Sequence, residues 1–210
     1  MRKQLRPAPP DEFRQHSDKW NSQWADLRTR NPAASFSWYA VGNRSSREIA
    51  LPVLREMNQG HCSFCDVFPL DDRSSEPIEH FKPKTRPEFH REAFSWDNLF
   101  YCCEFCQKTK RERWDTEFPP LRPDDPEYLF HRYFRFVYST GAIEPNPLLK
   151  ASSPDEWERA RVTIDFYGLD KPARNRRRLQ ALRMWSKASG RILDDHPYRD
   201  FLEGGALLDP

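Results

Sequence analysis

Two Cys-x-x-Cys pairs constrain the fold of this 210-residue chain more than any other feature. The first pair is Cys62 with Cys65, and the second is Cys103 with Cys106. Two residues between cysteines let both thiolates reach one ion, and two such pairs make the tetrahedral four-sulfur site that Zn²⁺ favours. Four thiolates leave no open position, so we expect a structural zinc whose binding energy contributes to folding. The alternative is two unrelated pairs of reduced, buried cysteines.

We expect the other cysteine and three of the histidines to have structural roles and no part in the chemistry. We expect Cys102 to be a packed thiol. His61 could replace a cysteine as a ligand, but we expect it to be a solvent-facing turn residue. His90 and His131 lie in no motif and are expected to be structural. A redox role is disfavoured, because neither pair follows a strand and opens a helix as in thioredoxin.

The composition limits the class of protein. The chain is 31% charged and 37% hydrophobic, so its core must be modest, with seven Trp and fifteen Phe supplying much of the burial. A net charge of +2 excludes a uniformly basic nucleic-acid coat, so any such contact needs local clusters. No apolar run is long enough for a membrane span, and the basic start lacks the apolar segment of a secretory signal. Five cysteines in such a chain predict reduced thiols and a cytoplasmic protein.

Helical patterns dominate the N-terminal part of the chain. Residues 1–10 predict an extended arm. Apolar spacing predicts a helix over residues 11–30 and a second over residues 45–58. Pro52 should kink the second helix or start a new segment.

The C-terminal part predicts a hairpin and two helices. Residues 133–138 read as a strand that pairs with residues 142–144. Ser153 should cap a helix that runs to residue 167, with Glu156 completing a capping box. A last helix is expected from about residue 172. The tail from Asp194 gives no clear signal.

This last helix is strongly basic. Residues 171–191 contain eight Lys or Arg and no acidic residue. A helical stripe is formed by Arg176, Arg183, Lys187 and Arg191. It could contact a nucleic-acid backbone, meet an acidic partner, or face water.

The segment between the cysteine pairs carries a specific resemblance. It reads IEHFKPK at residues 78–84 and WDNL at residues 96–99, and the second pair continues as CxxCQxxK. This order of motifs, over about residues 60–114, resembles the HNH endonucleases with the ββα-metal fold. The resemblance implies that His80 is the general base and that Glu79 is an acidic metal ligand.

The same resemblance implies two further roles. It implies that Asn98 holds the loop and orients the histidine. It also places Gln107 as the second metal ligand, where the family usually has His or Asn. The amide oxygen of glutamine can still coordinate a hard cation.

The chemistry of phosphodiester hydrolysis fits these residue types. A histidine with a pKa near 6.5 can activate water at neutral pH, and a divalent cation offsets charge on the phosphate. Glu79 and Gln107 offer oxygen ligands for Mg²⁺ or Mn²⁺. Because neighbouring residues on a strand point to opposite faces, Glu79 and His80 can share one site only if the strand is twisted, bulged or ends there.

Nearby cations are candidates for nucleic-acid contacts, which would give affinity and not sequence choice. A solvated charged surface is the alternative for each. These residues are Lys82, Lys84, Lys110 and Arg111.

A wider and weaker resemblance covers most of the chain. With MRKQLRPAPP at the start, LRPDDP after the core and RVTIDFYGLD near the end, the chain resembles the PtuB-type HNH nucleases of Septu and retron anti-phage systems. The resemblance implies an effector that acts with a PtuA-type ATPase, and it adds a retron reverse transcriptase complex as a further candidate partner. It also implies DNA or RNA, including transfer RNA, as the substrate.

The predicted architecture is α+β and mainly helical, with a zinc-stapled ββα-metal (HNH) core and an additional small β-hairpin. We expect N-terminal arm and helices over residues 1–59, the nuclease core over 60–118, and the hairpin with the basic helices over 119–210. The expected function is a metal-dependent HNH endonuclease. Alternatives are a catalytically weak or inactive zinc module that binds nucleic acid or bridges proteins, and an RNA-specific nuclease.

Overall fold

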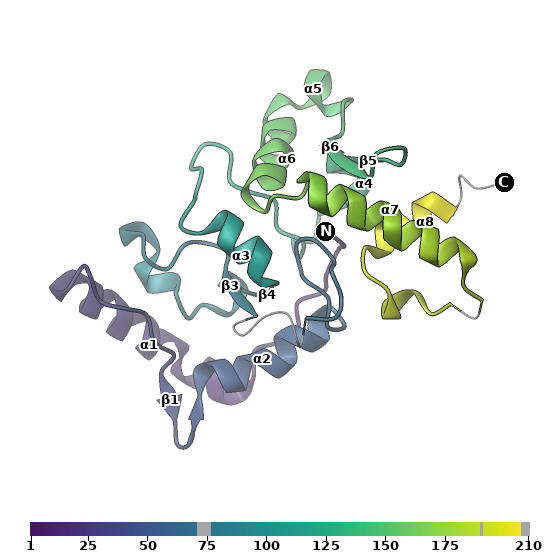
Figure 1. Ribbon diagram of the computed structural model, residues 1–210. Coiled ribbons are helices and arrows are strands. Elements are labelled where there is room, and N and C mark those ends of the chain that lie inside the picture. The colour runs from purple at the N-terminus through teal and green to yellow at the C-terminus, as the bar shows by residue number, and fades with distance from the viewer. Residues whose placement is uncertain (71–76, 190, 207–210) are drawn as a thin grey trace.

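The computed structural model is an α+β fold with small antiparallel sheets, and it describes residues 1–70, 77–189 and 191–206. The α+β class is confirmed. Figure 1 shows β3, β4 and α3 between α1 and α2 on one side and the C-terminal helices on the other. The paired strands are β1 (Ala40–Val41) with β2 (Arg44–Ser45), β3 (Ile78–His80) with β4 (Leu99–Tyr101), and β5 (Phe134–Val137) with β6 (Ala142–Pro145). The α-helices are α1 (Asp11–Arg30), α2 (Ser46–Met57), α3 (Glu104–Lys110), α4 (Phe130–Tyr133), α5 (Leu149–Ser152), α6 (Pro154–Phe166), α7 (Pro172–Lys187) and α8 (Arg199–Ala206); the 3₁₀ turns are η1 (Pro87–Glu92), η2 (Trp96–Asn98) and η3 (Leu193–Asp195).

The two predicted N-terminal helices are confirmed as α1 and α2. The apolar stripe of α1 buries Phe13, Trp20 and Trp24, as its spacing predicted. A capping box between Ser45 and Glu48 starts α2, so the backbone N–H groups of these two residues are satisfied by each other's side chains. The helix then continues through Pro52, and no new segment begins there.

The N-terminal arm lies against the centre of the molecule. Met1 and Gln4 are buried, and the Gln4 backbone N–H donates to the Pro123 carbonyl at 2.8 Å. The Arg6 guanidinium donates to Asp124 and to the carbonyls of Trp96 and Leu99. The arm therefore ties the turn before β4 to the LRPDDP segment at residues 121–126, which follows the second cysteine pair.

The predicted C-terminal hairpin and helices are present as β5–β6, α6 and α7. The capping box predicted for α6 is wrong. Ser153 makes no side-chain capping bond, and the Glu156 carboxylate pairs instead with Arg132. A charged partner from α4 therefore replaces the local backbone donor that the sequence suggested.

Helix α8 was not predicted. It buries Phe201, Leu202 and Gly205 on one face. The Arg199 side chain at its start is 1% exposed and binds the Asp66 carboxylate at 2.7 Å. Asp66 directly follows Cys65. The buried Arg199–Asp66 ion pair therefore fastens α8 to the first cysteine pair.

A continuous hydrophobic core includes residues from all three predicted segments, among them Trp24, Phe100 and Phe166. The division at residues 59 and 118 stays a prediction. Among the described residues, no helix has the length and apolarity that crossing a bilayer requires.

Candidate metal centre and active-site cleft

The four paired cysteines form one buried cluster. Their sulfur atoms all lie within 4.8 Å of one another. The Sγ atoms of Cys65 and Cys103 are 3.6 Å apart, and those of Cys62 and Cys106 are 3.9 Å apart. A tetrahedral site with Zn–S bonds of about 2.3 Å has sulfurs about 3.8 Å apart. The donor set and its spacing therefore fit a metal such as zinc.

A buried arginine contacts this cluster. The Arg174 Nη2 atom lies 3.1 Å from the Cys106 Sγ and 3.9 Å from the Cys103 Sγ. The Arg174 side chain comes from the first turn of α7 and is 5% exposed. Four thiolates around a divalent ion carry a net charge of about −2, so a guanidinium there offsets charge that water cannot reach.

Two expectations about neighbours of the cluster have different outcomes. Cys102 is a buried free thiol outside the four-sulfur group, as expected. The expectation that His61 faces solvent is wrong. Its ring is fully buried and stacks on Phe68 with centroids 4.4 Å apart. Both ring nitrogens lie 3.1 Å from backbone carbonyls, of which the N–H of a neutral ring can donate to one, and the imidazole lies outside the four-sulfur group.

Next to the cluster, β3, the loop that follows it, and α3 with the residues just after it line a cleft of about 150 Å³. Glu79, His80 and Gln107 all line it. β3 ends at His80, in regular register with β4. Glu79 and His80 can share the site because the strand ends at His80, and not because of a bulge.

The His80 imidazole is held with one nitrogen free. The ring is 5% exposed and hydrogen-bonds the backbone carbonyl of Ala93, while Nε2 is buried without a hydrogen-bond partner among the described residues. Burial, together with the positive charges of Lys84 and Lys110, holds the pKa of His80 well below 6.5. The ring is therefore neutral at physiological pH and presents an unused lone pair.

Two aromatic rings from the segment before β1 enclose this imidazole. Trp38 stacks on it with centroids 5.4 Å apart, and Phe36 meets it edge-on at 5.0 Å. Sequence reasoning missed both. The aromatic run FSWY at residues 36–39 is the one signal that could have suggested them.

The Glu79 carboxylate is engaged by a buried lysine. Lys110 Nζ lies 2.7 Å from Glu79 Oε1 and also donates to the His80 carbonyl at 3.0 Å. Burial raises the pKa of Glu79, and the Lys110 charge acts against that rise. Lys110 is fully buried, so its predicted place on a phosphate-binding surface is not what the structure shows.

Asn98 joins the two sides of the loop after β3. Its Oδ1 accepts the Lys82 N–H at 2.6 Å, and its Nδ2 donates to the carbonyls of Lys82 and Glu92. Gln107 Nε2 donates to the Cys102 carbonyl at 3.0 Å. This bond uses the amide nitrogen, which fixes the side chain with respect to the second cysteine pair.

The other three predicted phosphate contacts have different surroundings. Lys84 and Arg111 line the cleft, and Lys84 lies over the Phe36 ring at 4.9 Å. Lys82 forms an ion pair with Glu92 at 2.6 Å outside it. The structure thus brings Lys84 and Arg111, but not Lys82, beside His80.

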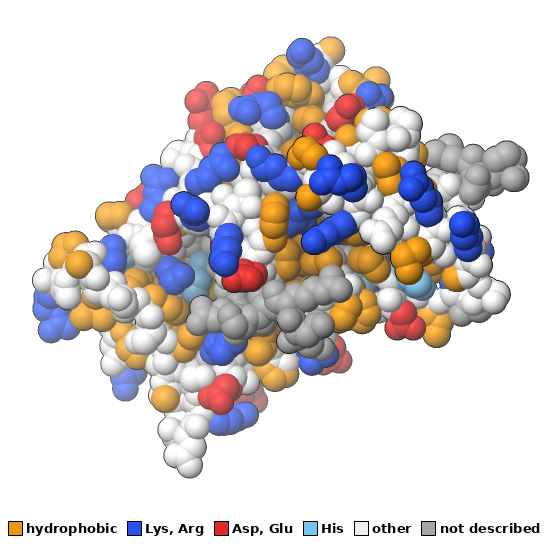
Figure 2. All heavy atoms as spheres, viewed as in Figure 1, with side chains coloured by type: hydrophobic (Ala, Val, Ile, Leu, Met, Phe, Trp, Pro, Cys, Tyr) orange, Lys and Arg blue, Asp and Glu red, His pale blue; other side chains and the backbone are white. Residues whose placement is uncertain are grey.

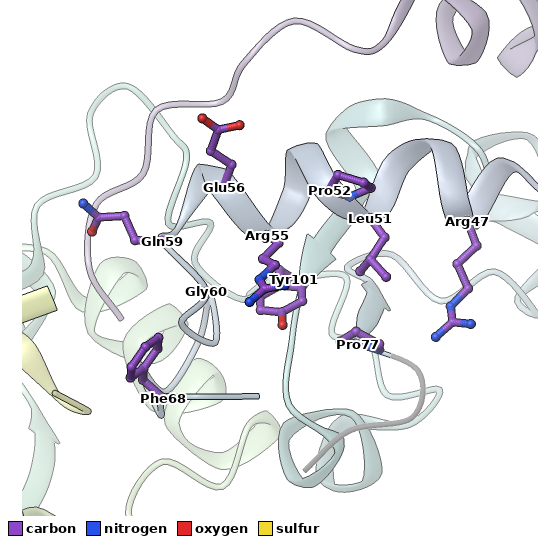
Figure 3. A pocket seen from close by; sticks show the side chains of 10 residues that line it. All are labelled: Arg47, Leu51, Pro52, Arg55, Glu56, Gln59, Gly60, Phe68, Pro77 and Tyr101. Atoms are coloured by element: carbon purple, nitrogen blue, oxygen red, sulfur yellow. The ribbon is translucent and has the colours of Figure 1, made fainter. Parts of the chain in front are cut away.

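A larger hollow of about 830 Å³ lies elsewhere, along α2 (Figure 3). Arg47, Leu51 and Arg55 point from the helix toward Pro77 and Tyr101. None of the predicted catalytic residues lines it. Size alone would therefore have pointed to a different place.

The chain was compared with known proteins. No protein-family model matches it. It is similar to the Septu protein PtuB of Bacillus mycoides, with 30% identity over an alignment of 73 residues that covers 30% of this chain and 24% of that protein. The chain thus matches about a quarter of the length of this curated relative. The similarity confirms the resemblance to PtuB over part of the chain.

Proposed function

We propose that the chain is a metal-dependent HNH-type endonuclease whose ββα-metal core is formed by β3, β4 and α3. One observation carries the proposal. His80 lines a cleft that Glu79 and Gln107 also line, beside the four-cysteine cluster, and its buried Nε2 has no hydrogen-bond partner among the described residues. A neutral histidine, oxygen ligands and a rigid metal-stapled support are what hydrolysis of a phosphodiester requires.

In this proposal His80 is the general base. Its hydrogen bond to the Ala93 carbonyl fixes the tautomer, so the lone pair stays on Nε2. The lowered pKa keeps that nitrogen free of a proton at neutral pH, ready to take one from water. Asn98 is a positioning residue, because its three bonds hold the loop that follows the base.

The ligand set suits a hard cation. Glu79 and Gln107 are the residues that would hold Mg²⁺ or Mn²⁺, ions that keep several waters and need few protein ligands. When bound, such an ion offsets the charge that develops on the phosphate. Lys84 and Arg111 line the same cleft and would contact phosphate oxygens.

The similarity to PtuB supports a setting for this activity. We propose that the chain is an effector of a Septu-type anti-phage system and works with a PtuA-type ATPase. A retron reverse transcriptase is a further candidate partner. DNA and RNA, transfer RNA included, are both candidate substrates.

A second function is favoured by the Glu79–Lys110 ion pair. Because Lys110 occupies one Glu79 oxygen, a divalent ion must compete with an ammonium group for it. A zinc module that binds nucleic acid or bridges proteins without cleaving would have the same core. An RNA-specific nuclease is the third candidate.

Cleavage assays separate these candidates. Purified protein is incubated with supercoiled plasmid, single-stranded DNA and transfer RNA, with Mg²⁺ or Mn²⁺ or with EDTA, and with and without the ATPase. We expect cleavage that EDTA stops. His80→Ala should abolish it while circular dichroism shows a retained fold, and His131→Ala, at an exposed histidine outside the cleft, should cut like the parent.

Each other result selects a different function. Equal cutting by His80→Ala and the parent would remove the assigned base. Cleavage of transfer RNA alone would select the RNA-specific nuclease. No cleavage under any condition would favour the binding module.

A further inference from the structure

Helix α7 is cationic on two opposite faces, and the two faces have different surroundings. Arg174 and Arg178 point inward and are buried. Arg174 contacts the cysteine cluster, and Arg178 donates to the carbonyls of Gly141 and Leu169. Both inward arginines therefore have contacts within the fold.

The outward face has no such partners. Arg176, Arg183 and Lys187 are all exposed and, at steps of seven and four residues, fall on one stripe about 180° from the buried pair. Among the described parts of the chain, none of the three has an ion pair. We call Arg176, Arg183 and Lys187 the outer stripe.

Some, but not all, of the other exposed arginines among the described residues are paired with carboxylates. Arg14 pairs with Asp11, Arg132 with Glu156, and Arg135 with Glu144. With 34 basic and 32 acidic residues, the chain has almost enough carboxylates to pair every cation. The outer stripe is thus a local excess of positive charge in a nearly neutral protein, and like charges along one helix face destabilise that helix.

Helix α7, which carries the outer stripe, lies beside α3, one of the elements that line the proposed cleft. The Arg174 guanidinium lies over the Phe105 ring of α3 at 4.3 Å, and a groove of about 280 Å³ between α3 and α7 is lined by Phe105 and Arg177. α3 also carries Gln107 of the cleft. Figure 2 shows Lys and Arg side chains over α3 and along α7 on the same side of the molecule.

We propose that the outer stripe binds the sugar–phosphate backbone of nucleic acid beyond the cleft, an inference that rests on the proposed nuclease function. The stripe spans about 16 Å along the helix axis, enough for several phosphates of one strand. Among the described exposed residues of α7, Met184 is the only large hydrophobic one. A protein interface has an apolar and aromatic core, so this surface suits phosphates better than an acidic protein.

The test is the salt dependence of binding. His80→Ala protein, full-length and zinc-loaded, is titrated against a labelled duplex, a labelled single strand and transfer RNA over a series of NaCl concentrations. Neutralising the outer stripe with Arg176→Gln, Arg183→Gln and Lys187→Gln should lower the slope of log K against log salt by about 2 to 3. Affinity at low salt should fall roughly tenfold or more.

A matched control removes the same charge elsewhere. Arg14→Gln, Arg132→Gln and Arg135→Gln neutralise three exposed arginines that already have carboxylate partners. This variant should keep the parental slope. Thermal melts of both variants verify that the fold is retained.

The outcomes distinguish this proposal from the nuclease proposal. If the parent binds nucleic acid but never cuts it, and the outer-stripe variant has a reduced slope, the nuclease proposal fails and the proposal for the outer stripe holds. If the parent cuts and the variant has an unchanged slope, only the proposal for the outer stripe fails. Tighter binding of poly-L-glutamate than of any nucleic acid would also overturn it and point to an acidic protein partner.

Discussion

The Lys110 ammonium lies 2.7 Å from the Glu79 carboxylate, and the lysine side chain is completely buried. A charge in such a place is tolerated only with a partner, because burial removes its hydration. The pair joins the last residue of α3 to the middle of β3. It therefore fixes the helix that carries Gln107 against the strand that carries His80.

Breaking this pair should destabilise the protein strongly. Lys110→Met leaves Glu79 buried without its cation, and we expect a loss of about 3–5 kcal/mol in the free energy of unfolding, measured in urea. Glu79→Gln combined with Lys110→Met should recover part of the loss. Lys108→Met is the control, because Lys108 pairs with Glu104 on the surface and should cost less than about 1 kcal/mol. Equal losses for the two single variants would contradict this account.

The cysteine cluster should hold one zinc per chain. Elemental analysis of purified protein measures this directly. Cys62→Ser together with Cys106→Ser should remove the ion and the cooperative unfolding transition, because metal binding contributes to folding. Cys102→Ser should retain the zinc, since Cys102 lies outside the four-sulfur group. A folded parent without metal would exclude the assignment.

The Arg174 guanidinium should slow zinc release. Replacing it with Met in Arg174→Met leaves the thiolate charge uncompensated in a buried site. We expect zinc transfer to a colorimetric chelator to become about 10–100 times faster. Arg177→Met is the comparison on the same helix, since Arg177 is exposed, and it should release zinc like the parent. Similar release from both variants would leave Arg174 with a packing role only.

Asp124 should make stability depend on pH in the acidic range. Burial acts to raise the pKa of Asp124, but hydrogen bonds and charges from Arg122 and Arg6 outweigh it and hold the pKa below its usual 3.8. A lowered carboxyl pKa gives stability that is present above pH 3.8 and lost as pH falls through the folded-state value.

Asp124→Asn tests this dependence. It should lower the free energy of unfolding by about 1–3 kcal/mol at neutral pH, and the difference from the parent should shrink below pH 3.8. Asp97→Asn, at a more exposed carboxylate near the same Arg122, should show a small effect. A constant difference down to the lowest pH would rule out the charge of Asp124 as its cause.

Several features were predictable because short-range patterns decide them. The stripe Phe13, Trp20 and Trp24 can be buried together only on a helix, and α1 has the predicted bounds. The spacing within each cysteine pair predicted a shared site, and the four sulfurs meet. The capping prediction failed at Ser153, because an ion pair of Glu156 with Arg132, 24 residues earlier in the chain, competes with the local bond.

The chain by itself determined the α+β class, the main helices and hairpin, and the residue types that can hold a metal, since these follow from periodicity and motif spacing. Only the tertiary structure decided which charged groups are buried. Lys110, Arg174 and Arg199 look like surface residues in the sequence, yet each is buried against a partner 31 to 133 positions away. Burial depends on contacts between distant segments, and no local pattern encodes them.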